Sequence, residues 1–309
     1  MKNFITIFTP SYNRAETLGR LYKSLIEQTN KNFEWVIVDD GSTDNTENIV
    51  NSWINEDNGF NIIYFKKKNG GKHTAINKGL ELARGKMFFI VDSDDYIVKD
   101  AIEKIIKYEK NIVKNENEKF GGIAFSKGYN ENKIIGTTFI GEYIDATSLE
   151  RKKYNINGDK SEIFYTDILK QNKFPEFEGE KFVTEALVWN RIARQGYKLR
   201  WFQDIICICE YREDGLTKKG SNIFKDSPKG LLLYLNEYIE DYKLNALRRL
   251  LKYEYYSNSI YNNKNILKAS KDLKIKPITL IIGIFLRKIV RIFHLNSNIK
   301  NTKKTQEKQ

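Results

Sequence analysis

Two carboxylates lie two positions apart directly after an apolar run. Residues 87–91 (MFFIV) have the composition of a buried strand, and Asp92, Ser93 and Asp94 follow them. Carboxylates placed in this way are hard oxygen ligands of the kind that Mg²⁺ and Mn²⁺ bind, and both ions keep positions open for phosphate oxygens. A metal held there could bridge a nucleotide diphosphate and neutralise the charge that builds on it as it leaves.

A second acidic pair and a glycine loop strengthen this interpretation. Asp39 and Asp40 end the apolar run at 35–38, and Asp39 could accept a hydrogen bond from a nucleobase N–H. Lys72 follows Gly71 in the loop 69–72 and could reach a phosphate, because glycine lets the backbone approach a ligand closely. Helix-capping aspartates would explain one acid per loop. They would not explain two adjacent acids in one loop and three within 92–95.

Strand-like and helix-like patterns alternate through residues 1–126 and must position these side chains. Apolar runs at 4–8, 35–38, 62–65 and 87–91 alternate with helical spacing at 18–26, 49–54 and 74–84. Asn13 and Glu16 have the spacing of a capping box before the first helix. The alternation predicts an α/β fold with a mostly parallel central sheet flanked by helices. Such sheets bind ligands at the carboxyl edge of their strands, where the acidic loops fall.

The pattern changes after residue 126. Residues 127–227 are less regular, with one clear helix at 183–195 and a strand-like run at 205–209. Residues 228–309 are helix-rich and hold 17 Lys and Arg against 6 Asp and Glu, so they carry +11 of the net charge of +12. The positive charge is therefore segregated from the acidic loops, which argues against a nucleic-acid partner.

Composition and missing motifs exclude several classes of protein. The 309 residues, 40% hydrophobic, can build a substantial core, and Cys207 and Cys209 cannot frame a disulfide-rich secreted fold. Neither a P-loop nor a dinucleotide-binding glycine motif is present, and two histidines are too few for a His-rich zinc site. The longest uncharged apolar run, 278–286, has nine residues, against the ~20 of a spanning helix. With no signal segment at the start, we expect a cytoplasmic location.

Four motifs in order resemble the family 2 inverting glycosyltransferases of the GT-A fold that build bacterial surface polysaccharides. They are 9–14 (TPSYNR), 36–44 (VIVDDGSTD), 69–73 (NGGKH) and 89–95 (FIVDSDD). The resemblance implies a nucleotide-sugar donor, most often a UDP-sugar, Mn²⁺ or Mg²⁺ as cofactor, and inversion at the anomeric carbon. It also implies a GT-A catalytic domain over 1–227, with its nucleotide-sugar-binding half at 1–126 and its acceptor half at 127–227.

The resemblance also assigns roles to individual residues. Asp94 is implied as the metal ligand proper, and Asp92 lies near both the ribose and the metal. The donor would be bound by the following residues: Thr9, Pro10, Tyr12, Arg14, Asp39, Asp40, Gly71, Lys72, Asp92, Ser93, Arg212 and Lys218. Arg212 and Lys218 lie in a loop, 211–220, which would close on the diphosphate.

The catalytic base is expected at the start of the helix 183–195. Family members carry an acid there beneath the acceptor site, and Glu185 is the candidate, with Thr184 in place of the usual first acid of a pair. A carboxylate there must reach the acceptor hydroxyl and remove its proton as the sugar develops oxocarbenium character. A first-turn glutamate that favours the helix dipole is the alternative interpretation. Glu178 and Glu180 are the rival candidates.

These features predict a metal-dependent transferase that adds one sugar to a glycan or lipid-linked acceptor. The Gln-x-x-Arg-Trp signature of processive polymer synthases is missing, which argues for single-sugar addition. A sugar nucleotidyltransferase on a related fold is one alternative, disfavoured because the first loop lacks glycine. A non-catalytic basic protein that binds a membrane surface is another.

The basic C-terminal region suggests a second property. Within 275–295 the polar residues Arg287, Arg291 and His294 share one helical face, and apolar residues lie largely on the other. This pattern predicts an interfacial helix that docks on the inner membrane. A core helix that packs on the catalytic domain would show the same pattern.

Overall fold

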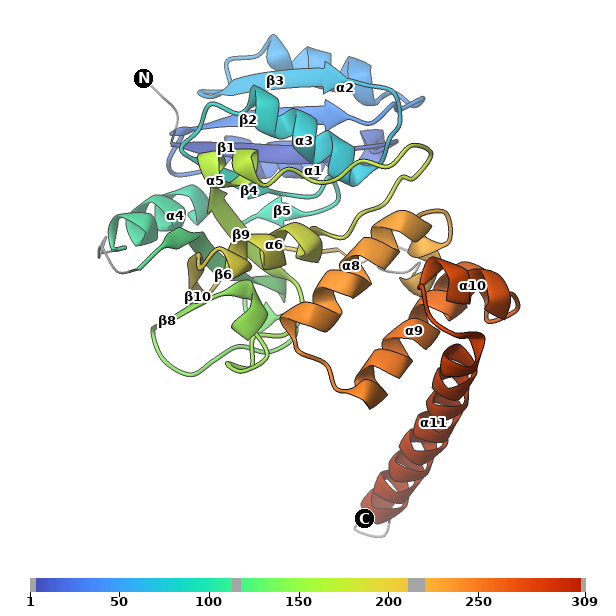
Figure 1. The fold of residues 1–309 in the computed structure, drawn as a ribbon. Helices are drawn as coiled ribbons and strands as arrows, with labels where there is room; N and C mark the ends of the chain where they lie inside the picture. Colours follow the sequence, from blue (N-terminus) through green and yellow to red (C-terminus); the bar gives the residue numbers. More distant parts are fainter. Residues whose placement is uncertain (1–3, 113–117, 211–219, 307–309) are drawn as a thin grey trace. The chain divides into compact units, whose positions relative to one another are not determined.

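A parallel sheet carries the first half of the chain in the computed structural model, which describes residues 4–112, 118–210 and 220–306, without the side chains of 221, 291 and 293–306. Its strands run in the order β3-β2-β1-β4 (Figure 1). They are β1 (Ile5–Ser11), β2 (Phe33–Asp39), β3 (Asn61–Lys66) and β4 (Met87–Ile90). Ser11 pairs with Asp39, so β1 and β2 end side by side. The predicted alternation of strands and helices is confirmed.

The second half of the sheet is mixed. β9 (Lys160–Tyr165) runs antiparallel to β4 and to β6 (Phe120–Asn130), whereas β10 (Lys198–Ile208) runs parallel to β6. Three short strands complete it: β5 (Tyr96–Ile97), β7 (Lys133–Ile134) and β8 (Tyr143–Ala146). The purely parallel pattern ends at β9, which lies antiparallel between β4 and β6.

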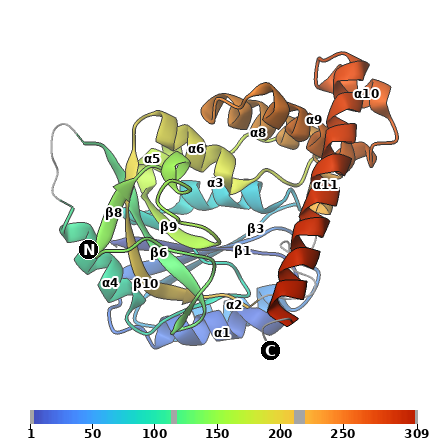
Figure 2. The ribbon, with the colours of Figure 1, turned by 90° about the horizontal axis from the view of Figure 1, so that it is seen from below.

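Helices cover both faces of this sheet (Figure 2). One face is covered by α1 (Ala15–Ile26), α2 (Thr46–Ile54) and α4 (Ala101–Lys110), whose apolar residues, such as Leu18, Trp53 and Ile105, join the largest core cluster. The other face is covered by α3 (Lys72–Leu82), α5 (Thr166–Gln171) and α6 (Glu185–Arg194), and a short helix, η1 (Ser148–Glu150), contacts α6. The fold is therefore the expected α/β arrangement.

The first two loops differ from the capping pattern that the sequence suggested. Arg14, not Asn13, precedes α1, and its side chain does not cap the helix; the Asp44 carboxylate accepts a hydrogen bond from the Ala15 amide at 3.0 Å instead. Asn13 instead has a positive φ of 53°, and its side chain accepts a hydrogen bond from the Thr43 amide at 2.8 Å. The predicted capping box does not form, because the Asn13 side chain instead accepts a hydrogen bond from the Thr43 amide of the neighbouring loop.

The chain divides into two compact units, Met1–Lys218 and Lys219–Gln309. The second unit is helical, as predicted for the C-terminal region, with η2 (Gly220–Phe224), α8 (Pro228–Asp241), α9 (Ala246–Tyr261), α10 (Ile266–Asp272) and α11 (Pro277–Gln306). Leu231, Leu235 and Tyr256 form its core. Across the described residues, no helix combines the length and apolar character needed to span a membrane.

We expect Gly79→Ala to lower the free energy of unfolding by about 1–3 kcal/mol, because overpacking is costly in a close-packed interior. A Cβ at Gly79 of α3 would lie 2.2 Å from the ring of Phe8 in β1. The matched control is Gly19→Ala on α1, where a Cβ would have no neighbour within 4 Å. The control should stabilise the protein by up to about 1 kcal/mol, since alanine favours helices more than glycine does. Urea unfolding measures both, and equal effects of the two substitutions would contradict the close α3–β1 packing.

Candidate active site

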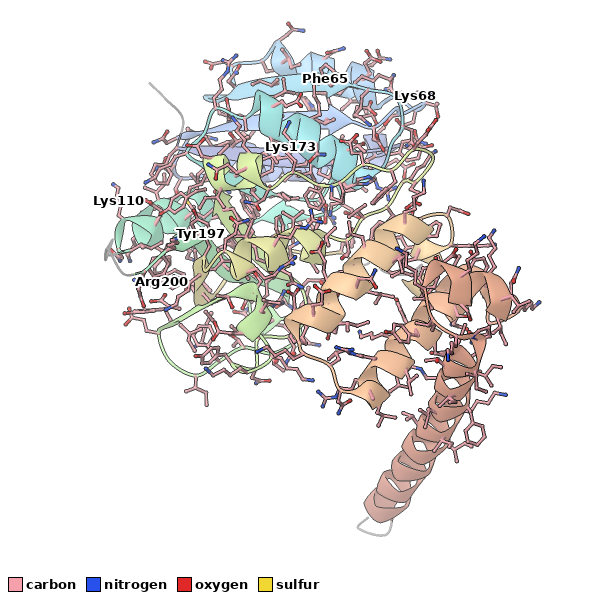
Figure 3. The ribbon with its side chains drawn as sticks, in the orientation of Figure 1. Phe65, Lys68, Lys110, Lys173, Tyr197 and Arg200 are labelled. Carbon is pink, nitrogen blue, oxygen red and sulfur yellow. The ribbon has the colours of Figure 1, made fainter. Side chains whose placement is uncertain are left out.

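The acidic loops meet at the carboxyl edge of the parallel strands. In Figure 3, Lys68, just after β3, marks this edge, and Lys110 and Tyr197 mark the opposite one. Val91 extends β4 by donating its amide to the Phe8 carbonyl of β1, so Asp92 emerges beside the end of β1. The parallel register thus gathers at one edge the loops that the sequence predicted to converge.

Asp39 is fully buried, and both of its carboxylate oxygens accept hydrogen bonds. Oδ1 accepts from the amide of Ser42 at 2.7 Å, and Oδ2 accepts from the hydroxyl of Tyr64 at 2.6 Å. Burial together with this carboxylate raises the pKa of Tyr64, so the phenol keeps its proton and remains a donor. Asp39 is thus held rigidly at the end of β2, and its contact with a base stays a prediction.

The Asp40 side chain holds the glycine loop, residues 69–72, in place. Its carboxylate accepts hydrogen bonds from the amides of Gly70 and Gly71 at 2.9 and 2.7 Å, and it forms an ion pair with Lys67 at 2.7 Å. Gly71 has a φ of 94°, and a Cβ there would lie 1.8 Å from the Lys181 carbonyl oxygen. Only glycine fits this position, where the start of α3 touches the segment that leads into α6.

Lys72 connects the two carboxylates that matter most for the predicted chemistry. Its ammonium lies 2.6 Å from Oδ1 of Asp92 and 2.8 Å from Oε1 of Glu185. Burial opposes the charge of Lys72, but the two carboxylates outweigh it and raise the pKa of the ammonium above its ordinary value. Burial likewise opposes the charge of Asp92, and Lys72, Lys127 and Arg14 together hold the pKa of that carboxyl below its ordinary value.

Asp94 forms no ion pair with a cation in the part of the chain that the structure describes. Burial and the like charges of Asp92 and Asp95 raise its pKa above the ordinary value. Its backbone carbonyl accepts a hydrogen bond from the guanidinium of Arg20, which fixes the loop. Oxygen donors with surplus negative charge suit a hard divalent cation, so Asp92 and Asp94 fit the implied metal.

Behind this loop lies an ion pair that the sequence reasoning missed. The ammonium of Lys127 on β6 lies 3.0 Å from Oδ2 of Asp95, and the Cys209 thiol lies 3.2 Å from the same oxygen. Cys207 and Cys209 are free thiols, the first buried. These thiols and Asp95 are close enough to share a metal ion, but Lys127 already supplies a positive charge there. A lysine within the apolar run 120–128 was the available sequence signal.

The remaining predicted donor-binding residues are distributed around the first loop. Thr9 is buried, and its hydroxyl accepts a hydrogen bond from the indole of Trp35 at 2.9 Å. Pro10 and Arg14 are half-buried, Ser93 is buried and Tyr12 is exposed. Arg212 and Lys218 lie outside the described residues. Of the rivals to Glu185, Glu178 is exposed and Glu180 is buried.

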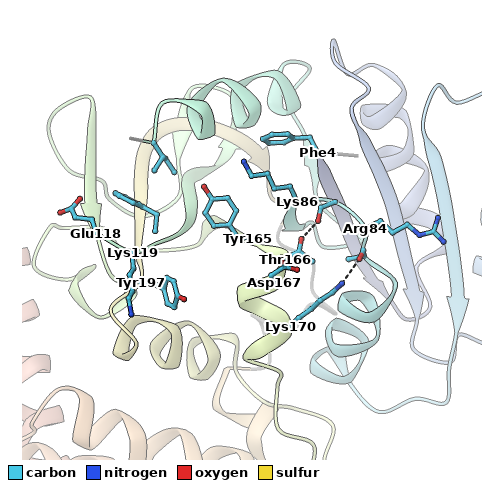
Figure 4. A pocket seen from close by; sticks show the side chains of 14 residues that line it. Phe4, Arg84, Lys86, Glu118, Lys119, Tyr165, Thr166, Asp167, Lys170 and Tyr197 are labelled. Carbon is cyan, nitrogen blue, oxygen red and sulfur yellow. Dashed lines mark hydrogen bonds between the residues drawn. The ribbon is translucent and has the colours of Figure 1, made fainter. Parts of the chain in front are cut away.

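A hollow of about 910 Å³ lies at the opposite edge of the sheet and is separate from this cluster (Figure 4). Phe4, Lys86 and Tyr165 are among its lining residues. Two of its lysines already have partners: Lys170 donates to the Ala83 carbonyl at 3.0 Å, and Lys86 pairs with Glu109 at 2.6 Å. Because Phe4 immediately precedes β1, the hollow lies at the amino edge of the parallel strands, away from the acidic loops.

Known proteins resemble the chain at the level of sequence and of fold. The chain is 35% identical over 107 residues to the putative teichuronic acid biosynthesis glycosyltransferase TuaG of Bacillus subtilis, covering 35% of this chain and 42% of TuaG. It is 30% identical over 182 residues to an uncharacterized glycosyltransferase of Haemophilus influenzae, covering 58% of this chain and 68% of that protein. The chain spans less than half the length of TuaG and of other curated relatives that it matches.

A solved structure of similar fold is S. aureus TarS 1-349 in complex with UDP-GlcNAc, with a TM-score of 0.60 and 22% identity over 87% of this chain and 78% of that one. A sequence model described as glycosyl transferase family 2 matches residues 6–155, which include the first loop, both acidic loops and the glycine loop. Together with the Haemophilus influenzae relative, this match shows that the chain belongs to glycosyl transferase family 2.

Proposed function

We propose that this chain is a metal-dependent inverting glycosyltransferase that moves one sugar from a UDP-sugar to a hydroxyl of a glycan or lipid-linked acceptor during surface polysaccharide synthesis. The observation that carries the proposal is the cluster in which Lys72 joins Asp92, beside Asp94, to Glu185. It puts carboxylates for a metal next to a separate carboxylate at the start of α6. The similarity to TuaG, a putative teichuronic acid biosynthesis glycosyltransferase, supports a role in polysaccharide synthesis.

The metal site would use Asp92 and Asp94. A bound Mn²⁺ or Mg²⁺ would neutralise charge on the leaving diphosphate. Asp92 and Asp94 would orient that ion, and Asp39, Thr9 and the first loop would shape the nucleotide pocket. The rigid hydrogen bonds of Asp39 and Asp40 fix these loops before the donor binds, which reduces the cost of ordering them.

Glu185 is proposed as the general base. Inversion requires the acceptor oxygen to attack the anomeric carbon from the side opposite the diphosphate. The new C–O bond forms as the bond to the phosphate oxygen breaks, and the acceptor proton passes to the Glu185 carboxylate. Glu185 is the first residue of α6, and 36% of its side chain is exposed, although the Oε1 that meets Lys72 is buried.

We expect Asp94→Asn to lower kcat/KM by roughly 100-fold or more, because a site with few protein ligands loses one charged donor. The fold should be intact, as judged by circular dichroism and thermal unfolding. The control is Asp100→Asn, which removes a carboxylate that pairs with Lys104 at 3.0 Å on α4. Near-normal activity of Asp94→Asn at low Mn²⁺ would rule out the assigned role.

Glu185→Gln should lower kcat by about 10²–10⁴-fold and leave the Kd for UDP nearly unchanged, because the amide keeps the side-chain volume but cannot take a proton. Turnover with a panel of UDP-sugars and calorimetric binding of UDP separate the two effects. Glu178→Gln and Glu180→Gln are the matched comparisons, since both are the rival bases. If UDP affinity fell and the rate per bound donor held, Glu185 would be a structural residue.

The proposed site of action is the cytoplasmic face of the membrane, reached through α11. Leu280 is buried, and a Cβ on Gly283 would lie 2.6 Å from the Leu250 carbonyl, so this side of α11 packs against α9. Arg287 also lies on that side, 2.9 Å from Glu254 of α9. Large apolar side chains elsewhere on α11 are exposed, namely Ile278, Ile281, Ile282, Phe285 and Ile292. An exposed apolar stripe within a region of charge +11 suits an anionic lipid surface.

The full chain should sediment with phosphatidylglycerol vesicles at low salt and much less with phosphatidylcholine vesicles. The double substitution Ile281→Asp with Phe285→Asp should abolish this binding, because both side chains are exposed and acidic groups are repelled by anionic lipid. Ile140→Asp, at an exposed apolar residue of the first unit, is the control and should bind like the native chain. Binding that is equal for the two variants, or absent in the native chain, would contradict docking through α11.

A further inference from the structure

The Lys72 ammonium pairs with a carboxylate oxygen of Asp92 that a bound metal would use as a ligand. Its ammonium is 2.6 Å from Oδ1 of Asp92, and only one-fifth of the Lys72 side chain is exposed. A divalent ion that used this oxygen would face a positive charge a few ångströms away, in a partly desolvated site where such repulsion is strong. The ammonium and the metal therefore compete for Asp92.

The same ammonium also holds the proposed base. Glu185 Oε1 lies 2.8 Å from Lys72 Nζ, so one cation compensates two carboxylates that belong to different steps of the reaction. A glutamate paired in this way is turned toward Lys72 and not toward an acceptor. For Glu185 to receive a proton from an acceptor hydroxyl, the ion pair has to loosen.

A nucleotide diphosphate can relieve both contacts. Lys72 is the first residue of α3 and follows the glycine loop that Asp40 fixes, so its backbone is anchored while the long side chain can turn. The diphosphate offers several charged oxygens in place of two carboxylates, and the metal can then take over Asp92. Lys72 compensates Asp92 and Glu185 in the free protein, and a bound metal would compensate Asp92 and Asp94 once the donor is present.

We propose that Lys72 is an internal placeholder cation, which occupies Asp92 and Glu185 in the free protein and moves to the donor diphosphate when the nucleotide and the metal bind together. The inference rests on the proposed function for the identities of metal and base. It predicts that nucleotide and metal bind with positive coupling, and that part of this coupling passes through Lys72.

The test is equilibrium binding of Mn²⁺, followed by electron paramagnetic resonance with and without UDP. Without UDP, Lys72→Met should bind Mn²⁺ about tenfold more tightly than the native chain, because the competing charge is gone. With UDP, this advantage should disappear, so the coupling between UDP and Mn²⁺ shrinks by a similar factor. Lys72→Gln provides a second neutral variant should Lys72→Met unfold.

Two further variants make the result specific. Lys72→Arg retains the positive charge and should bind Mn²⁺ like the native chain. Lys67→Met removes an ion pair of similar length from the same loop, 2.7 Å to Asp40, and should leave Mn²⁺ affinity without UDP unchanged. If the neutral variants at Lys72 bind Mn²⁺ no more tightly than the native chain, the placeholder role is wrong.

Asp94→Asn separates this inference from the proposed function. Loss of Mn²⁺ binding in Asp94→Asn, together with no gain in Lys72→Met, overturns the placeholder alone and leaves the metal site standing. Unchanged Mn²⁺ binding in Asp94→Asn overturns the metal assignment and the placeholder role that rests on it. A gain in Lys72→Met that requires Asp94 supports both.

Discussion

The candidate site depends on two ion pairs of the Lys72 ammonium. Lys72 compensates Asp92 at the end of β4 and Glu185 at the start of α6, which come from distant parts of the chain. Two carboxylates brought this close without a cation between them would repel each other in a partly desolvated site. In the structure the proposed metal ligand and the proposed base thus lie side by side with the Lys72 ammonium between them.

The position of Lys72 depends in turn on backbone geometry. Asp40 accepts two hydrogen bonds from the glycine loop, and Gly71 lets the start of α3 touch the Lys181 backbone. This close contact brings the segment before α6 to the acidic edge of the sheet. Burial of the Asp40 carboxylate is compensated by its amide donors and by Lys67, so the loop is held before any ligand arrives.

A second buried ion pair repeats the arrangement three residues further along the same loop. Lys127 compensates Asp95 as Lys72 compensates Asp92, and two thiols complete the surroundings of Asp95. In the acidic loop, Asp95 is thus paired with Lys127 of β6 and Asp92 with Lys72. Asp94 lies between them, and within the described residues it forms no ion pair. This contrast explains why burial and like charge raise the pKa of Asp94, whereas nearby cations hold the pKa of Asp92 below its ordinary value despite its burial.

The sequence by itself determined the parallel half of the sheet, the acidic loops at its carboxyl edge and the glutamate at the start of α6, because apolar periodicity and turn residues are local signals. Only the tertiary structure decided that β9 runs antiparallel to β4, that Asn13 bonds to Thr43 instead of capping α1, and that Lys72 meets Glu185. These contacts join residues far apart in the chain. They depend on how loops pack and on how buried charges are compensated. A local pattern of residues contains no information on either.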